Sequence, residues 1–304
     1  METILELKNV KKTINGKEII KGLSFAVQKG EIFGFLGPNG AGKTTTIRMI
    51  VGLMRITDGD IIVCDKSIKD SFREAISQIG AIVENPEMYK FLTGFQNLQQ
   101  YARMQNGISK EKIREVVELV GLSERIHDKV KTFSLGMRQR LGLAQCLLHD
   151  PKLLILDEPT NGLDPAGIKE IREYLRKLTR ERGISVIVSS HLLSEMEMMC
   201  DRIAIIQNGE LIEVQEVKNF VSEEKQVVFF FETGVMGNAT AQWLENKYEM
   251  RLVETGFTLK CVREDIPIII KKLTESNVAV FSAKPVTKTL EDRFLEMTAK
   301  EGGK

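Results

Sequence analysis

A glycine-rich segment that ends in a lysine gives the clearest chemical signal in the sequence. Residues 37–44 read GPNGAGKT and fit the spacing G-x-x-x-x-G-K-[ST]. Glycines let successive backbone N–H groups point into one concavity, Lys43 adds a compact positive charge, and the Thr44 hydroxyl suits Mg²⁺. These features predict a site for the β- and γ-phosphates of a nucleotide. The predicted phosphate-binding residues are Gly37, Pro38, Asn39, Gly40, Ala41, Gly42, Lys43, Thr44 and Thr45.

Two acidic residues directly after an apolar run predict the catalytic half of such a site. Residues 153–156 read LLIL and are followed by Asp157 and Glu158. A buried parallel strand would deliver both carboxylates to its C-terminal edge, where ligands bind in sheets of this kind. We expect Asp157 to hold Mg²⁺ through water. We expect Glu158 to polarise the attacking water, as its general base or as its orienter.

The elements around these two motifs predict an α/β fold. Residues 31–36 form a predicted strand that runs straight into the glycine-rich segment, and apolar residues recur with helical spacing over 47–54. Continuous apolar runs at 153–156 and 184–188 are typical of strands buried on both faces of a parallel sheet. Residues 168–178 between them form a predicted amphipathic crossover helix. The predicted core is therefore a P-loop NTPase core, with a mainly parallel sheet flanked by helices.

Antiparallel strands are expected at the edge of this core. Residues 3–10 are a predicted strand, and after an Asn-Gly turn residues 18–20 and 23–27 are predicted to form two further strands. A second hairpin is predicted from residues 203–206 and 210–214. The antiparallel strands at the start of the chain predict an edge subdomain attached to the parallel core.

Two further regions extend the predicted core. Helical spacing at 94–106 and 113–120 indicates a helical insertion, and the pattern changes near residues 222–225. Beyond this change we expect a small α+β domain with strands 227–231, 257–262 and 278–282 and helices 241–247, 266–276 and one that begins at Thr289. The expected domains are residues 1–218, with the insertion at about 84–150, and residues 225–304.

The overall composition argues against several classes of function. The chain has 304 residues, with 43 Lys plus Arg against 42 Asp plus Glu, so its net charge is +1. A balanced chain has no global field to hold nucleic acid, and no nucleic-acid partner is expected. No apolar run approaches the roughly 18 residues of a membrane span, and the first residues lack the apolar core of a signal peptide. Four widely separated cysteines favour reduced thiols and a cytoplasmic location.

A third motif lies between the glycine-rich segment and the two acids. Residues 133–140 read FSLGMRQR, and here the sequence resembles the ATPase subunits of ATP-binding cassette (ABC) transporters. The family signature is L-S-G-G-Q. This chain keeps the serine as Ser134 and the second glycine as Gly136, but it has Leu135 in place of the first glycine and Met137 in place of the glutamine. In the family this motif, which also begins a helix, caps the γ-phosphate of an ATP held by a second protomer. The resemblance implies that role for these four residues.

Two more segments extend the resemblance, which covers residues 1 to about 216. Residues 161–164 read NGLD and resemble the family's loop that crosses the dimer interface, with Asp164 as its acidic residue. His191 follows the predicted strand 184–188 and resembles the switch histidine that contacts the γ-phosphate. Five motifs therefore occur in the order that the family shows.

Outside the signature segment, the sequence departs from the family at two further positions. Glu84 stands where the family usually has a glutamine, and a carboxylate there would be a charged oxygen ligand for Mg²⁺. Ile14 stands where the family usually has an aromatic residue that stacks on adenine. An aliphatic contact should stabilise a base less than stacking does, so we predict weak discrimination between ATP and GTP.

The resemblance implies an ATPase coupled to transport, with ATP and Mg²⁺ as cofactors. Its implied partners are an integral membrane permease and a second copy of the chain or a related ATPase subunit, at the cytoplasmic face of the membrane. The apolar residues Met88, Tyr89 and Phe91 of the insertion are candidates for an exposed contact with the permease, and the alternative is that they form the insertion's own core. Glu84, the FSLGMRQR segment and the C-terminal domain together resemble the branch that exports bacitracin- and lantibiotic-type peptides.

Three alternatives remain open from the sequence. A soluble ABC-type ATPase acting on nucleic acid or ribosomes would show salt-sensitive binding to RNA or DNA. A P-loop kinase or GTPase would not account for Ser134 and Gly136 or for the loop 161–164. A non-enzymatic role, in regulation or dimer contact, applies to the residues beyond about 220.

Overall fold

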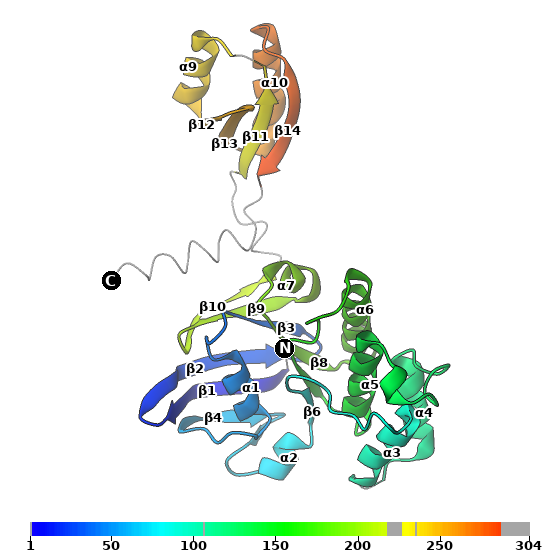
Figure 1. Ribbon diagram of the computed structural model, residues 1–304. Coiled ribbons are helices and arrows are strands. Elements are labelled where there is room, and N and C mark those ends of the chain that lie inside the picture. The colour runs from blue at the N-terminus through cyan, green and yellow to red at the C-terminus, as the bar shows by residue number, and fades with distance from the viewer. Residues whose placement is uncertain (1, 106, 218–226, 235, 287–304) are drawn as a thin grey trace. The chain divides into compact units, whose positions relative to one another are not determined.

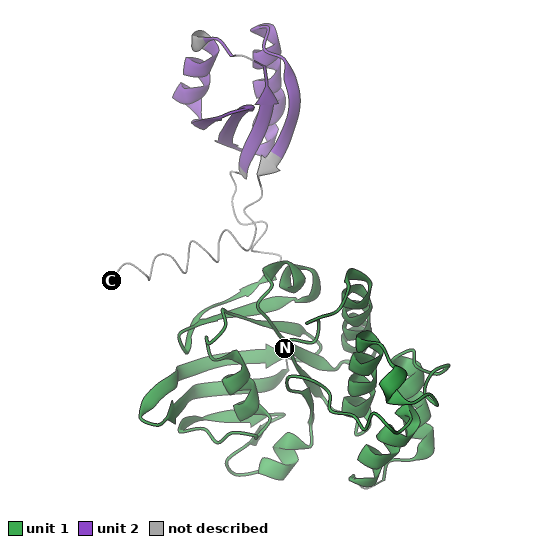
Figure 2. Ribbon diagram, in the orientation of Figure 1, with its two compact units in different colours: residues 1–217 green, residues 218–304 purple. Residues whose placement is uncertain are grey.

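The computed structural model describes residues 2–105, 107–217, 227–234 and 236–286. The chain forms two compact units, residues 1–217 and residues 218–304, which Figure 2 shows in green and purple. All of the motifs identified above belong to the first unit. The segment 222–225 and the helix predicted to begin at Thr289 lie outside the described residues.

A six-stranded sheet forms the centre of the first unit (Figure 1). Its strands, in spatial order, are β10 (Glu210–Glu216), β9 (Arg202–Gln207), β3 (Ile32–Leu36), β8 (Ser185–Ser190), β7 (Leu153–Asp157) and β6 (Ile79–Ile82). All neighbours run parallel except β10, which pairs antiparallel with β9. Every residue of β3, β7 and β8 is buried, as expected for apolar strands covered on both faces. The predicted α/β fold with a mainly parallel sheet is confirmed.

A second, antiparallel sheet completes the first unit. Its strands, in spatial order, are β2 (Lys17–Gln28), β1 (Thr3–Ile14), β4 (Asp58–Val63) and β5 (Lys66–Ser67), and the short helix α2 (Phe72–Ile76) follows β5 in the chain. The prediction of separate strands at 18–20 and 23–27 is wrong, because both belong to β2. Lys21 and Leu23 pair with adjacent residues of β1, so Gly22 is an extra residue at a β-bulge. Its φ of 94° is a conformation that glycine adopts readily.

Helix α1 (Lys43–Ile50) packs in the apolar layer between the two sheets. Its buried Ile47 and Ile50 belong to the same apolar cluster as Leu5 of the antiparallel sheet and Phe35 of β3. Burial of this helix face therefore anchors the start of α1 against the end of β3, which is where the glycine-rich segment lies.

Helices α6 (Pro165–Arg182) and α7 (Leu193–Met199) also pack on the main sheet. The apolar face of α6 is buried through residues that include Ile171 and Leu175, which agrees with the predicted crossover helix. α7 approaches β3 closely at Gly34, where an added Cβ would lie 2.8 Å from the Met196 sulfur. Residues on the opposite side of β3 face α1, so the central strands are covered on both faces.

A helical region lies beside the main sheet (Figure 1). It contains α3 (Gly94–Arg103), α4 (Lys110–Leu119), the 3₁₀ turn η1 (Val130–Thr132) and α5 (Leu135–Leu147). α5 packs closely on β6, since an added Cβ at Gly80 would lie 2.7 Å from the carbonyl oxygen of Cys146. In the part of the chain that the structure describes, no helix combines the length and the apolar composition needed to cross a membrane.

The second unit is a small α+β unit with its own core. In chain order it contains β11 (Val227–Thr233), α9 (Asn238–Lys247), β12 (Glu249–Val253), β13 (Gly256–Cys261), the 3₁₀ turn η2 (Arg263–Asp265), α10 (Ile266–Glu275) and β14 (Val280–Val286). The spatial order β12-β13-β11-β14, with antiparallel neighbours, is the ferredoxin-like arrangement. Phe231 and Phe257 stack in the core with ring centroids 5.2 Å apart. β12 was not predicted, because most of its side chains are exposed and its sequence shows no alternation.

Candidate nucleotide-binding and hydrolysis site

The glycine-rich segment joins the end of β3 to the start of α1. Leu36 is the last residue of β3 and Lys43 is the first of α1. Gly42, the N-cap of α1, has a φ of 108°, and an added Cβ would lie 2.5 Å from Cδ1 of Ile20. The backbone conformation therefore favours glycine at this position, and any larger residue would also have to displace the end of the Ile20 side chain.

The start of α1 presents backbone N–H groups that are open to an anion. Within the described structure no side chain caps this end of α1, and its first turn contains no acidic residue. The first N–H groups of a helix have no partner inside the helix, and the helix dipole makes this end partly positive. Such an end binds phosphate well when the preceding loop also directs N–H groups to it.

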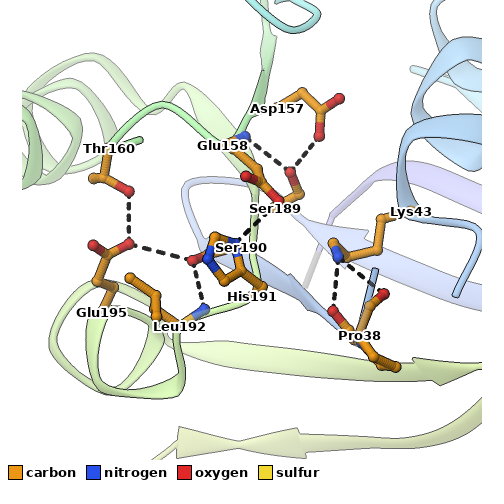
Figure 3. Close-up of polar contacts among 11 residues, drawn as sticks. Pro38, Lys43, Asp157, Glu158, Thr160, Ser189, Ser190, His191, Leu192 and Glu195 are labelled. Carbon is orange, nitrogen blue, oxygen red and sulfur yellow. Dashed lines mark hydrogen bonds and ion pairs between the residues drawn. The ribbon is translucent and has the colours of Figure 1, made fainter. Parts of the chain in front are cut away.

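Lys43 is buried beneath the loop and faces the two acids (Figure 3). Its Nζ donates hydrogen bonds to the carbonyl oxygens of Gly37 at 2.7 Å and Pro38 at 3.3 Å. Burial lowers the pKa of Lys43 below its ordinary value, and the negative charges of Glu158 and Asp157 oppose this shift. The loop carbonyls and the two carboxylates therefore both interact with the positive charge of Lys43.

Ser189 ties the end of β7 to the end of β8 (Figure 3). Its Oγ donates to Oδ1 of Asp157 at 2.5 Å and accepts from the backbone N–H of Glu158 at 3.0 Å. Asp157 and Ser189 are both buried, which strengthens a hydrogen bond to a carboxylate. The bond fixes the orientation of Asp157 and uses only one of its two carboxylate oxygens.

Glu158 and His191 form a pair at the carboxyl ends of the two strands. Nδ1 of His191 lies 3.3 Å from Oε1 of Glu158. Glu158 has a φ of 49°, an uncommon conformation for a residue with a side chain. The side chains are 43% and 27% exposed for His191 and Glu158, so both are open to solvent. A carboxylate in this position can hold a water molecule and accept its proton.

A buried carboxylate that was not predicted lies next to this pair. Glu195 of α7 is 7% exposed, and its Oε2 accepts hydrogen bonds from Thr160 Oγ1 at 2.6 Å and Ser190 Oγ at 3.2 Å (Figure 3). The available signal was an acidic residue on a short helix, four positions after His191. That signal is weak, because acids are common on solvated helix faces.

The signature segment and the loop 161–164 lie against each other. Leu135 Cδ2 would lie 3.1 Å from a Cβ added at Gly162. Exposed Ser134 caps α5 by accepting from the Met137 backbone at 3.2 Å, and exposed Asp164 caps α6 in the same way. Met137 itself is buried, and Leu135 and Gly136 are half-buried. The starts of α5 and α6 are therefore both exposed at their capping residues.

Glu84 and Ile14, the two departures from the family outside the signature segment, are exposed. Glu84 has a φ of 68°, and its Oε1 accepts from Arg48 of α1 at 2.5 Å. An exposed ion pair contributes about 0–1 kcal/mol, so this carboxylate can exchange partners easily. Ile14 is the last residue of β1 and is 37% exposed.

The chain shows extensive similarity to known proteins. Residues 20–161 match the family described as "ABC transporter". A Bacillus subtilis (strain 168) protein named "Uncharacterized ABC transporter ATP-binding protein YhcH" is 62% identical over 298 residues, which cover 98% of this chain and 97% of the relative. The "Bacitracin transport ATP-binding protein BcrA" of Bacillus licheniformis is 46% identical over 213 residues, 70% of each chain. A solved "ATP binding subunit of ABC transporter" is 29% identical with a TM-score of 0.64, covering 71% of this chain and 91% of the other.

Proposed function

Because this chain belongs to the ABC transporter family, we propose that two copies of it clamp ATP and Mg²⁺ between them and power export through a separate membrane subunit. As an ATP-binding subunit of this family, the chain is a transport-coupled ATPase. The observation that carries the proposal is the meeting of three groups at one edge of the main sheet: Lys43, the Asp157–Glu158 pair and His191.

The glycine-rich segment would hold the β- and γ-phosphates of ATP. The open N–H groups at the start of α1 would receive phosphate oxygens. Lys43 would exchange its bonds to the carbonyls of Gly37 and Pro38 for bonds to phosphate. A buried ammonium gains more from an anionic partner than from carbonyl dipoles, which supports its role in binding.

The donors for Mg²⁺ fit the chemistry of that ion. Thr44 stands at the start of α1 next to Lys43, and in the described structure its hydroxyl has no hydrogen-bond partner. Asp157 retains one carboxylate oxygen that Ser189 does not use. Mg²⁺ in such sites takes one or two protein oxygens together with phosphates and waters, and it neutralises phosphate charge. Glu84 would join this set, directly or through water, after leaving Arg48.

Glu158 would act on the attacking water. Its carboxylate is partly exposed at the strand end and would orient the water and take its proton. His191 shares a contact with this carboxylate through Nδ1, which leaves Nε2 to reach a γ-phosphate oxygen. The histidine therefore connects the phosphate to the residue that activates water.

A second copy of the chain would close the site. Ser134 and Asp164 are exposed at the starts of α5 and α6, and the segments that hold them contact each other at Leu135 and Gly162 in one copy. The start of α5 offers N–H donors and a hydroxyl that can still donate its proton while it caps the helix. In the proposed dimer these donors contact the γ-phosphate held by the other copy, and hydrolysis lets the two copies separate.

The membrane subunit would dock on the insertion expected at about residues 84–150, which includes the segment that leads into α3. Tyr89 and Phe91 are 53% and 70% exposed, and their ring centroids lie 5.8 Å apart. A groove of about 380 Å³ is lined by Leu53, Val83 and Tyr101 among other residues. Exposed apolar clusters of this kind commonly bind partner proteins, and here the partner is a cytoplasmic segment of the permease. The chain would then lie on the cytoplasmic face of the membrane.

The proposed cargo is a peptide antibiotic of the bacitracin or lantibiotic type. The support is the similarity to the B. licheniformis protein named for bacitracin transport. The proposed cargo rests on that relative and not on the site itself, and the proposed direction rests on the resemblance to the peptide-exporting branch. The relatives give no support to the alternative of an ATPase that acts on nucleic acid or ribosomes.

The test is to express the chain with the integral membrane polypeptide that copurifies with it, and to measure phosphate release in a lipid bilayer. We expect ATP- and Mg²⁺-dependent hydrolysis that rises steeply with ATP, because two sites close together. We expect bacitracin or a lantibiotic to stimulate this rate. No phosphate release by the reconstituted complex would refute the dimeric ATPase mechanism, and release without stimulation by either peptide would refute the cargo.

A further inference from the structure

We propose that Glu195 is a positioning residue that sets the placement of His191 and of the loop 161–164 for hydrolysis. The inference rests on the proposed function and goes beyond it, because it assigns a role to a residue that does not touch the nucleotide. Glu195 lies on α7, four positions after His191. Its role follows from which two segments its carboxylate joins.

One bond of Glu195 controls the backbone on either side of His191. Ser190 Oγ donates to Oε2 of Glu195 at 3.2 Å and accepts from the Leu192 backbone N–H at 2.9 Å. The residues before and after the histidine are therefore tied to one hydroxyl, and that hydroxyl is tied to Glu195 (Figure 3). A shift of the carboxylate would move the base of the His191 side chain.

The other bond of Glu195 reaches the segment that follows Glu158. Thr160 Oγ1 donates to the same Oε2 at 2.6 Å. Thr160 directly precedes the loop 161–164, and its carbonyl oxygen accepts from the Leu163 N–H at 3.1 Å, which closes the turn of that loop. Oε2 of Glu195 thus joins the segment 190–192, which carries His191, to the loop 161–164, which is proposed to cross the dimer interface.

Burial fixes the direction of the hydrogen bonds to Glu195. Glu195, Thr160 and Ser190 are 7%, 5% and 3% exposed, so water cannot replace a lost partner easily. A carboxylate can only accept hydrogen bonds, which forces both hydroxyl protons to point at it. Ser190 Oγ is then left with its lone pairs toward the Leu192 N–H. Replacing the carboxylate with an apolar group would free both hydroxyls to rotate and would loosen the two segments together.

The experiment compares Glu195→Ala and Glu195→Gln in the full-length chain, reconstituted with its membrane partner. The glutamine keeps a carbonyl oxygen that can stand where Oε2 stands and accept from both hydroxyls, because an amide oxygen has two lone pairs. We expect Glu195→Ala to lower kcat about tenfold to thirtyfold, less than the roughly 10²-fold that a 1 Å misplacement of reacting groups can cost, with a KM for ATP within about twofold of wild type. We expect Glu195→Gln to recover kcat to within about threefold. Glu181→Gln, at an exposed position on α6, is the control and should match wild type.

The outcomes separate this inference from the proposed function. An inactive wild-type complex would overturn the proposed function, whereas an active wild type with unchanged kcat in Glu195→Ala would overturn only the inference. A rise in KM at constant kcat, or a glutamine variant as slow as the alanine variant, would also overturn it. A lower melting temperature with normal kcat would reduce Glu195 to a stability role.

A second pair of variants covers the case in which Glu195→Ala does not fold. Thr160→Val and Ser190→Ala each remove one hydroxyl and keep the carboxylate. We expect each to lower kcat several-fold without a change in KM. Wild-type kcat in both variants would overturn the inference.

Discussion

Two regions of the site differ in how their polar groups are bonded. One is the glycine-rich loop, and the other is the carboxyl ends of β7 and β8 (residues 157–158 and 189–191), called the β7–β8 edge below. Around the loop, Lys43 bonds to backbone carbonyls, and the start of α1 has open N–H groups. At the β7–β8 edge, side chains bond to one another, as in the contacts of Ser189 with Asp157 and of His191 with Glu158. The loop therefore offers free hydrogen-bond donors to a ligand, whereas most polar side chains of the β7–β8 edge already have hydrogen-bond partners without a ligand.

This difference separates binding from chemistry. A loop built from backbone donors holds phosphate in the ground state and in the transition state alike, so it should govern affinity. An edge built from side chains in fixed mutual geometry acts on the water and the developing charge, so it should govern the turnover rate. Variants of the two regions should therefore change different kinetic constants.

The sharpest separation should come from Glu158→Gln. The amide keeps the size of the side chain and removes its ability to accept a proton, so kcat should fall by roughly 10²–10⁴. The affinity for ATP should stay close to wild type, because Lys43 and the loop are unchanged. Phosphate release and equilibrium nucleotide binding measure the two quantities. Near-normal turnover would break the assignment of chemistry to the β7–β8 edge.

Lys43→Met should give the opposite pattern. Loss of a charge-assisted contact to phosphate should weaken ATP binding on the order of 10-fold to 100-fold. The nucleotide-free variant should melt no lower than wild type, because burial of the Lys43 charge already opposes folding, as its lowered pKa indicates. Calorimetric binding and thermal unfolding test the two parts. Lys29→Met, at an exposed residue on the turn after β2, is the control. Unchanged ATP affinity in Lys43→Met would contradict the comparison.

Ser189→Ala tests whether the hydrogen bonds of the edge matter for its chemistry. Asp157 and the Glu158 backbone would both lose a buried partner. We expect kcat to fall about tenfold and the Mg²⁺ requirement to rise, with nucleotide binding in the absence of Mg²⁺ unchanged. Ser185→Ala is a matched control, because Ser185 is buried at the other end of β8 and accepts from the Gly30 N–H. An equal loss of rate in both variants would indicate a general effect on the strand.

The sequence predicted the parallel core well because its signals are local. Uninterrupted apolar runs at 153–156 and 184–188, and the loop between a strand and a helix, each specify structure within about ten residues. The single strand β2 was missed because a β-bulge at Gly22 imitates a break between two strands. The strand β12 was missed because its own sequence has no apolar alternation. It is a strand because it pairs with β13, and that neighbour cannot be identified from residues 249–253 alone.

The sequence motifs indicated the candidate site residues, but not the hydrogen bonds and ion pairs between residues that are distant in the chain. Lys43, Asp157, Glu158 and His191 could be named from spacing and family resemblance. The hydroxyl of Ser189 and the carboxylate of Glu195 act through residues distant in the chain, and an isolated serine or glutamate carries no spacing signal. The ion pair of Glu84 was equally hidden, because Arg48 stands on another element.

The smallest expected effect concerns the base, which neither the loop nor the β7–β8 edge contacts in the proposal. Ile14→Tyr at the exposed end of β1 would supply an aromatic ring where the chain has an aliphatic side chain. Stacking contributes roughly 1–3 kcal/mol per base, and an exposed position should deliver the lower end, about a fivefold gain in affinity for ATP. GTP should gain less if the new ring favours adenine, so the ratio of the two affinities should rise while kcat stays constant. Val253→Tyr, at an exposed position in the second unit, should leave the ratio unchanged. Strong ATP preference already present in the wild type would show that base selection does not depend on an aromatic residue at position 14.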